Sequence, residues 1–315
     1  TNNGTVKINL KETIAPSNGI AMSDTVVLTI NYNTTTGVIT GISTDKNNNY
    51  FDFKSATEID LINPNVPEWY IYKVNQDGNV VKKEVTFETT IAITGGKTYK
   101  ETYKTNSSTG KTGNIISEAA QKELVQKYMN NKKDVTAKVT IKEQKVEGYG
   151  DPVTCNFTLT YNGIKMTASG LDNTQKCTNN NTSTTITIKN IEIKPRWITV
   201  KKVDNENKGI GPAKFNVSFV QDGTTTNSNL TIQGTGGVYY NTTTFNPKSY
   251  NPITVTIDET EGPAHFNKSD TSVVLQFNWK GKEETGYWEP TIIRGKDQLV
   301  EFTDSEFSDL TTNKY

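Results

Sequence analysis

Residues 197–203 read WITVKKV, and they predict a β-strand with one anomalous side chain. Side chains alternate between the two faces of a strand, so Ile198, Val200 and Lys202 share a face. Lys202 therefore continues an apolar face. Burying an unpaired ammonium group costs several kcal/mol. Either Lys202 has a buried partner, or the strand register is shifted by one residue and the lysine is solvated.

Two other stretches of the sequence repeat this anomaly with acidic residues. In NPITVTIDETEGP, at 251–263, the apolar alternation is continued by Glu259. In QLVEFTD, at 298–304, the alternation is continued by Asp304. Three strands thus each place an ionisable residue on a buried face, and the signs of the charges are complementary. The pattern predicts that Lys202, Glu259 and Asp304 form one buried cluster.

The composition predicts an all-β protein built from β-sandwich domains in tandem. Short runs rich in Val, Ile, Thr, Tyr and Phe alternate with clusters of Gly, Pro, Asn and Asp. The 34 basic and 34 acidic residues cancel, which argues against a nucleic-acid partner, because such proteins need a cationic face. No run of about 18 apolar residues is present, so no membrane-spanning helix is predicted.

The length of 315 residues suggests about two domains. Pro195 and the new alternating pattern that follows it predict a boundary between a β-rich domain at 1–195 and a sandwich domain at 196–310. The second domain is predicted to have strands at 197–203, 213–220, 229–233, 252–259, 272–279 and 298–304. One helix is predicted within 114–129, with Ser117 as its cap and an apolar face at helical spacing.

The second domain resembles the Cna B-type (prealbumin-like) domains of Gram-positive surface adhesins and pilins. The resemblance rests on ITVKKVD at 198–204, KGIGPAKFNV at 208–217 and ETEGP at 259–263, in that order. It implies a prealbumin-like β-sandwich of about 110 residues. It also implies an extracellular protein, held at the cell wall through a segment outside this chain, that binds a host or extracellular-matrix protein or a glycan.

The resemblance further implies an intramolecular isopeptide bond between Lys202 and Asp304, assisted by Glu259. Burial favours the neutral amine, which is the nucleophile, and a protonated acid can polarise the acceptor carbonyl. The folded core holds the groups at high effective molarity. The usual acceptor in the family is Asn, so Asp304 is a departure that requires loss of water instead of ammonia. The bond would form once per molecule, as a maturation step without turnover.

The first domain also contains a potential acceptor. Asn190 follows Ile186 and Ile188 on an apolar face in the last strand before the boundary. The sequence does not identify its lysine, although Lys73 does share a strand face with Trp69. A second crosslink and a buried Asn that satisfies backbone groups both stay open.

The two cysteines, Cys155 and Cys177, are 22 residues apart in the sequence. They can form a disulfide in an oxidising compartment, or they can be two buried thiols.

We predict no enzymatic turnover, no metal site and no cofactor. His265 is the single histidine, which leaves no catalytic triad or closed zinc site at a telling spacing. STGKTG, at 108–113, lacks the first glycine of a phosphate-binding loop.

Aromatic residues offer a potential ligand surface. GYWEP, at 286–290, is predicted to be a loop in which Tyr287 and Trp288 could contact a ligand, whereas Trp69 and Trp197 are predicted to pack in the core. Two alternative functions stay open. A structural pilin subunit is one, although the family's Tyr-Pro-Lys motif does not occur here, and a carbohydrate-binding module of a secreted protein is the other.

Overall fold

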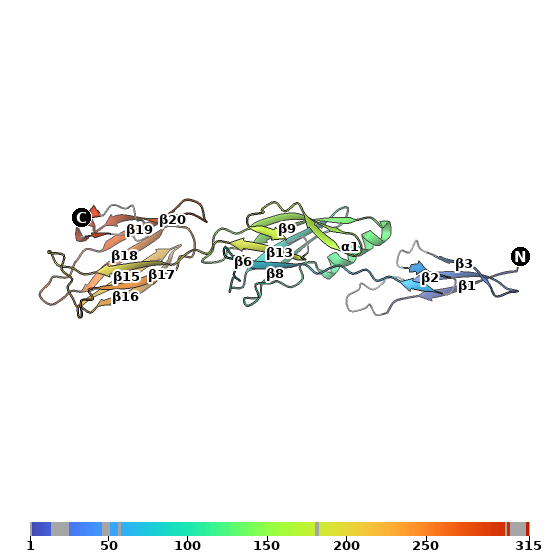
Figure 1. The fold of residues 1–315 in the computed structure, drawn as a ribbon, viewed down its shortest axis with the longest axis horizontal. Coiled ribbons are helices and arrows are strands. Elements are labelled where there is room, and N and C mark those ends of the chain that lie inside the picture. The colour runs from blue at the N-terminus through green and yellow to red at the C-terminus, as the bar shows by residue number, and fades with distance from the viewer. Residues whose placement is uncertain are drawn as a thin grey trace. The chain divides into compact units, whose positions relative to one another are not determined.

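The computed structural model describes residues 2–13, 25–45, 51–55, 58–179, 183–299, 301–302 and 313–314. The chain divides into two compact units (Figure 1). Unit 1 comprises Thr1–Gln144 and Pro152–Asn190, and unit 2 comprises Lys145–Asp151 and Ile191–Tyr315. Among the described residues, no helix is long and apolar enough to cross a membrane.

Unit 1 begins with a three-stranded antiparallel sheet in the order β1-β2-β3. These strands span Asn3–Leu10, Val26–Asn33 and Ile39–Thr44. Val26 and Leu28 on β2 are buried, because alternate residues of that strand face the same side. Two short strands, β4 (Phe51–Phe53) and β5 (Ile59–Leu61), pair next.

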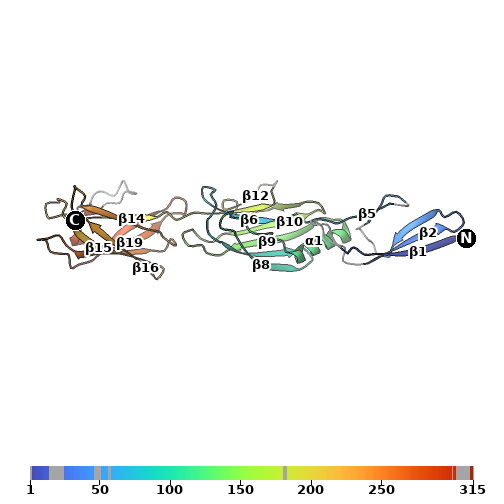
Figure 2. The ribbon, with the colours of Figure 1, turned by 90° about the horizontal axis from the view of Figure 1, so that it is seen from below.

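The main body of unit 1 has a five-stranded sheet in the order β11-β10-β9-β7-β8. Its strands are β7 (Thr86–Ile93), β8 (Thr98–Lys104), β9 (Val135–Glu143), β10 (Thr154–Tyr161) and β11 (Met166–Ser169). A three-stranded sheet has the order β12-β13-β6, with β6 (Tyr70–Asn75), β12 (Cys177–Asn179) and β13 (Thr185–Asn190). Figure 2 shows β12 and β6 on one side of this unit and β9 and β8 on the other. Strand β13 runs parallel to β6.

The predicted helix is present as α1 (Glu118–Asn131). Ser117 is the N-cap residue, but its side chain makes no capping hydrogen bond. Ala120, Leu124, Val125 and Met129 are buried, and the helix contacts β7 and β9. The apolar face that the sequence shows at helical spacing is therefore the face that packs against the five-stranded sheet.

Unit 2 has a five-stranded antiparallel sheet in the order β16-β15-β18-β19-β20, and a two-stranded sheet of β14 and β17. The strands are β14 (Arg196–Lys201), β15 (Ala213–Gln221), β16 (Thr224–Ile232), β17 (Tyr240–Phe245), β18 (Ile253–Glu261), β19 (Val273–Lys280) and β20 (Tyr287–Arg294). Ile198 and Val200 of β14 pack against a core that includes Phe219 and Val255. The all-β fold with one α-helix agrees with the composition.

Unit 2 differs from the sequence prediction in three places. Strands β17 and β20 were not predicted, and GYWEP opens β20 instead of forming a loop. Within the predicted strand 298–304, Gln298 ends a short 3₁₀ helix at Lys296–Gln298, and Glu301–Phe302 forms strand β21, which pairs with β22 (Asn313–Lys314). Residues 300, 303 and 304 lie outside the described residues. Tyr287 and Trp288 pair with Lys280 and Trp279, and this cross-strand pairing is a non-local contact that the composition of GYWEP does not reveal.

The two units meet in sequence at Asn190 and Ile191, five residues before the predicted boundary at residue 195. Residues 145–151 belong with unit 2 because Tyr149 bridges to Glu192 and Gly148 accepts a hydrogen bond from Ile193. Strand β9 therefore ends in unit 1, the connection Lys145–Asp151 belongs to unit 2, and β10 begins again in unit 1.

Candidate functional sites

Unit 1 contains a buried lysine, a buried acid and a buried amide in the interior between its five-stranded sheet and its β12-β13-β6 sheet. Lys73 lies on β6, Glu143 at the end of β9 and Asn190 at the end of β13. Lys73 is 0%, Glu143 6% and Asn190 1% exposed. Lys73 and Asn190 come from the three-stranded sheet, whereas Glu143 comes from the five-stranded sheet.

Lys73 and Glu143 form an ion pair out of contact with water. The distance between Lys73 Nζ and Glu143 Oε1 is 3.0 Å, and both side chains are 0% exposed. The second carboxylate oxygen, Oε2, accepts a hydrogen bond of 3.0 Å from the backbone N–H of Val153. Such a pair is worth little to stability, because removing both charges from water costs nearly as much as their attraction returns. A chemical role accounts for the pair better than a stabilising one.

Asn190 lies on the same face as Lys73, one diagonal step away. Lys73 pairs with Ile188, and Asn75 pairs with Asn190. A strand spacing of about 4.8 Å and a rise of about 3.3 Å per residue place the Cα atoms of Lys73 and Asn190 about 8 Å apart, within reach of a lysine side chain. Among the described residues, neither Nδ2 nor Oδ1 of Asn190 has a hydrogen-bond partner. A buried amide of this kind is rare, because an unpaired polar group is costly in the interior.

The environment of Lys73 favours its nucleophilic form. Burial lowers the pKa of Lys73 to about 8, and the attraction of the Glu143 carboxylate limits this fall. Roughly a tenth of the molecules would then have a neutral amine at pH 7, compared with less than about a thousandth for an exposed lysine. The site therefore combines an activated amine, a carboxylate and an unpaired carboxamide.

These three groups can form an amide bond. The neutral Lys73 nitrogen can attack the Asn190 carboxamide carbon, and the Glu143 carboxylate can accept the proton that the attacking nitrogen releases. Glu143 can then pass this proton to the departing nitrogen, so that ammonia leaves as the new carbon–nitrogen bond persists. The balance is one amine and one carboxamide in, and one secondary amide and one ammonia out.

The rate of this reaction is expected to rise with pH. Below pH 8 the neutral fraction of Lys73 grows about tenfold per pH unit, and above pH 8 it levels off. The measurement is the intact mass of chain made by cell-free synthesis and quenched at timed intervals between pH 6 and 9. Lys73→Arg is the control, because arginine stays protonated and should lose no ammonia. A flat profile from pH 6 to 8 would show that Lys73 instead transfers its proton internally to Glu143.

Glu143 is the member of this site that the sequence analysis missed. The residues of β9 alternate with Val135, Ala137, Val139 and Ile141 buried, and Glu143 continues that face. This is the same signal that identified Glu259 in the second unit. It could have been found by applying one rule to every strand, namely an acidic residue that extends an apolar face.

Unit 2 brings Lys202 and Glu259 together. The distance between Lys202 Nζ and Glu259 Oε2 is 2.9 Å, with side-chain exposures of 19% and 2%. Glu259 Oε2 also accepts a 2.9 Å hydrogen bond from the backbone N–H of Ser269, while Oε1 has no hydrogen-bond partner in the described part of the chain. Asp304, the predicted acceptor, lies outside the described residues.

A pocket of about 380 Å³ opens beside Glu259 and is bounded by Ser269 and Thr271. The acid therefore lies at the edge of an accessible space, whereas Glu143 in unit 1 is enclosed. The buried, unpaired Oε1 leaves one acceptor position of Glu259 for a further group.

The two predicted ligand-contacting aromatics lie in different environments. Trp288 is 2% exposed and packs edge-on against Trp279, with ring centroids 5.4 Å apart, so it is not available to a ligand. Tyr287 is 42% exposed. Trp69 is buried as predicted, but Trp197 is 50% exposed. The prediction that Trp197 packs in the core is wrong, because on β14 the alternate residues Ile198 and Val200 face the core instead.

Cys155 and Cys177 form a disulfide bridge, with their Cα atoms 6.0 Å apart. The bridge joins β10 of the five-stranded sheet to β12 of the three-stranded sheet. Both cysteines are 0% exposed. Within the described residues, no group of three or more His, Cys, Asp or Glu side chains could hold a metal ion.

No protein-family model matches this chain, and no curated protein matches it significantly. The matched solved structures include pilus adhesins and pilins. A C-terminal fragment of the pilus adhesin SpaC from Lactobacillus rhamnosus GG is 15% identical over 72% of this chain and 86% of that chain, with a TM-score of 0.38. SpaC in its open conformation is 12% identical over 96% of this chain, with a TM-score of 0.44. The match covers 42% of that SpaC chain.

A streptococcal ancillary pilin is 14% identical over 84% of this chain and 74% of that chain, with a TM-score of 0.29.

Proposed function

We propose that this chain is an extracellular adhesin segment in which each unit is closed by an intramolecular isopeptide bond. The bonds join Lys73 to Asn190 in unit 1 and Lys202 to Asp304 in unit 2. Glu143 and Glu259 transfer the protons of the two reactions. The reaction occurs once per molecule and makes the chain a mechanically and proteolytically resistant surface protein, which acts without enzymatic turnover.

The observation on which this proposal rests is the buried set of Lys73, Glu143 and Asn190. A protein that used these residues only for packing would leave an amide without partners beside an ion pair in its core. Apolar residues of similar size would cost less. Bond formation removes the lysine charge and the unpaired carboxamide together, since the product is one neutral secondary amide beside the Glu143 carboxylate.

The second bond is supported by the arrangement in unit 2. Lys202 and Glu259 are in contact, and Glu259 keeps an unpaired oxygen. Lys202 follows β14, the first strand of the unit after Ile191, and Asp304 follows Phe302 near the chain end. A bond between them would join the first strand of the unit to its last part.

Both bonds would alter how the chain responds to a pulling force. Strands β6 and β13 open and close the sandwich of unit 1, and they lie side by side in parallel. A covalent link between them passes force through a bond instead of through a ladder of hydrogen bonds. The residues between the two linked positions are then shielded from extension.

Single-molecule stretching of the chain by its two ends tests this expectation. With both links formed, two segments cannot extend under force. One is the roughly 120 residues between Lys73 and Asn190, and the other is the roughly 100 residues between Lys202 and Asp304. These segments correspond to about 40 nm and about 35 nm of contour length. Asn190→Ala should restore about 33 nm, because the Cys155–Cys177 disulfide still holds a loop of 22 residues within the segment, and Lys202→Ala should restore about 35 nm. Full extension of the wild-type chain would refute the proposal.

The adhesive role is the part of the proposal that concerns partners. We expect a host or extracellular-matrix protein or a glycan to bind, with unit 1 as the predicted binding unit and unit 2 as the stalk. The disulfide supports an extracellular location, because such bonds persist in oxidising compartments. Adhesion that survives substitution of the surface loops of unit 1 would count against this division of roles. The burial of Trp288 argues against a carbohydrate-binding module built on that residue.

A further inference from the structure

The disulfide of unit 1 lies close to the Lys73 site, and both connect the same two sheets. Cys177 pairs with Ile188, and Ile188 pairs with Lys73, so the three residues form one row across the three-stranded sheet. Two strand spacings place the Cα atoms of Cys177 and Lys73 about 10 Å apart.

The same relation holds on the opposite sheet. Cys155 on β10 pairs with Ile141 on β9, and Glu143 is two residues further along that strand. Residues two apart on a strand share a face, so Cys155, Ile141 and Glu143 all point into the interior. The bridge from Cys155 to Cys177 and the ion pair from Glu143 to Lys73 are therefore neighbouring links between the two sheets.

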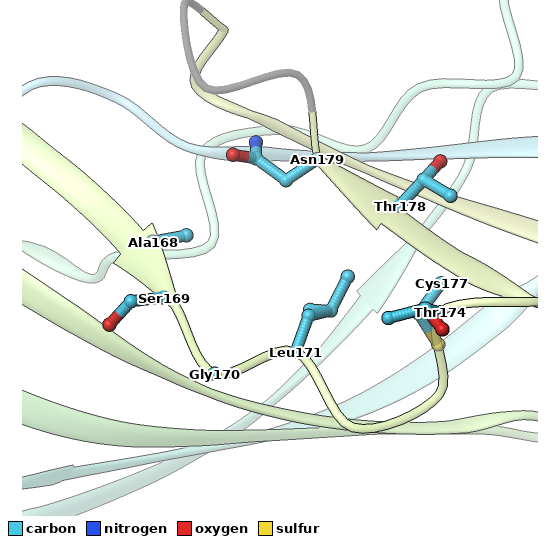
Figure 3. A pocket seen from close by; sticks show the side chains of 8 residues that line it. All are labelled: Ala168, Ser169, Gly170, Leu171, Thr174, Cys177, Thr178 and Asn179. Carbon is cyan, nitrogen blue, oxygen red and sulfur yellow. The ribbon is translucent and has the colours of Figure 1, made fainter.

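The sandwich is open at the edge where the disulfide lies. Strand β11 ends the five-stranded sheet, strand β12 ends the three-stranded sheet, and neither pairs with the other. A groove of about 240 Å³ separates them, lined by Ser169, Leu171 and Asn179 among others. Figure 3 shows Ala168 and Ser169, at the end of β11, on one side of the groove and Cys177, Thr174 and Thr178 on the other. At this edge no backbone hydrogen bonds pair β11 with β12, and the disulfide joins the two sheets covalently.

The proposed reaction depends on the separation of the sheets. Glu143 must reach the nitrogen of Lys73 while Lys73 reaches Asn190, and Glu143 alone of the three comes from the opposite sheet. Misplacement of a catalytic group by about 1 Å can cost about 100-fold in rate. The disulfide, about 10 Å from the reacting groups, holds the two sheets at a fixed separation. When the disulfide is reduced, no covalent bond between these strands holds that separation.

We infer that Cys155 and Cys177 are positioning residues for the Lys73–Asn190 crosslink, so that disulfide formation precedes and accelerates isopeptide formation. This inference rests on the proposed function. The disulfide step transfers two electrons and two protons from the thiols to an external disulfide oxidant, of the class of oxidised glutathione. The isopeptide step then releases ammonia. Because the disulfide forms first, the Lys73–Asn190 bond would form slowly in a reducing compartment and rapidly after export to an oxidising one.

The test follows the mass of the Lys202→Ala chain during cell-free synthesis, in which Lys202 cannot react. One reaction contains dithiothreitol and the other oxidised glutathione, and samples are quenched in acidic denaturant. In the oxidising reaction we expect a species about 2 Da light to precede one about 19 Da light, from loss of two hydrogens and then ammonia. In the reducing reaction we expect the 17 Da loss to be about 100-fold slower.

Glu143→Gln separates a positioning role from a general effect on folding. If the disulfide acts through Glu143, the slow residual reaction of this variant should have the same rate in both conditions. A double variant, Cys155→Ala with Cys177→Val, replaces the disulfide with two apolar side chains. In both the reducing and the oxidising reaction it should lose ammonia as slowly as the reduced chain does. Protease resistance, sampled at the same times, reports how much chain has folded.

The outcomes are distinct. Absence of any 17 Da loss from the oxidised chain overturns the crosslink in unit 1 and this inference with it. Equal rates in both conditions overturn the inference and leave the crosslink standing. A reduced chain that never becomes protease-resistant assigns the disulfide to folding, which also overturns the positioning role. A slow reaction in folded, reduced chain supports it.

Discussion

Replacing Asn190 with alanine is expected to remove a mass deficit of about 17 Da and to lower the melting temperature of unit 1 by about 10–20 °C. The mass change reflects the ammonia lost when Lys73 bonds to Asn190. The thermal change follows from chain entropy, since a link closing a loop of roughly 120 residues stabilises by about 5 kcal/mol. Intact mass spectrometry and differential scanning calorimetry measure the two effects.

Lys189→Ala is the matched control for this experiment. Lys189 precedes Asn190 on β13 and points to the opposite face, so the 17 Da deficit should persist. If Asn190→Ala does not fold, proteolysis of the wild-type chain still decides the question, because a branched peptide containing Lys73 and Asn190 is either found or not. A wild-type chain with no deficit beyond those of the disulfide and the second bond would contradict the prediction.

Replacing Lys202 with alanine is expected to remove a second deficit, of about 18 Da, because Lys202 and Asp304 would condense with loss of water. The link closes a loop of roughly 100 residues, so its loss should destabilise unit 2 by about 5 kcal/mol. Unit 2 is smaller than unit 1, and its melting temperature should fall by at least as much. Intact mass and calorimetry again provide the measurements.

Lys201→Ala provides the matched control, since Lys201 is the exposed neighbour of Lys202 and should keep the 18 Da deficit. Glu259→Gln should abolish the deficit while preserving the side-chain shape, because the amide cannot shuttle protons. A full-mass wild-type chain would show that Lys202 is held by its ion pair with Glu259 alone. It would leave the crosslink in unit 1 untouched.

The two proposed crosslink sites differ in how far they are buried. Lys73 and Glu143 are both fully enclosed, whereas the Lys202 side chain is 19% exposed. Electrostatic interactions and pKa shifts grow as water is excluded. Burial lowers the pKa of Lys73, and we expect the Lys73–Asn190 bond to form more completely than the bond in unit 2.

Alternation along single strands was sufficient to predict much of this protein. It identified the strands around Lys202 and Glu259, and these two residues do contact each other. It placed Asn190 on a buried face with Ile186 and Ile188. It also predicted a helix within 114–129 whose apolar face packs inward. Each of these features is local, since the period of 2 or 3.6 residues is written in consecutive positions.

Pairing between distant strands was not predictable in the same way. Strand β17 was missed because its sequence, YNTTTF, is polar and becomes a strand by pairing with β14. Trp197 and Trp288 exchanged their predicted environments, because burial depends on which face of a strand meets the second sheet. Composition around a tryptophan does not contain that information.

The sequence by itself determined the all-β class, the strand faces and the presence of ionisable residues on buried faces. Only the tertiary structure decided that Lys73, Glu143 and Asn190 form one site. Their strands are far apart in the chain, and β6 meets β13 in parallel, while β9 belongs to the other sheet. The physical reason is that a strand's periodicity fixes the direction of its side chains, whereas sheet order and packing fix their neighbours.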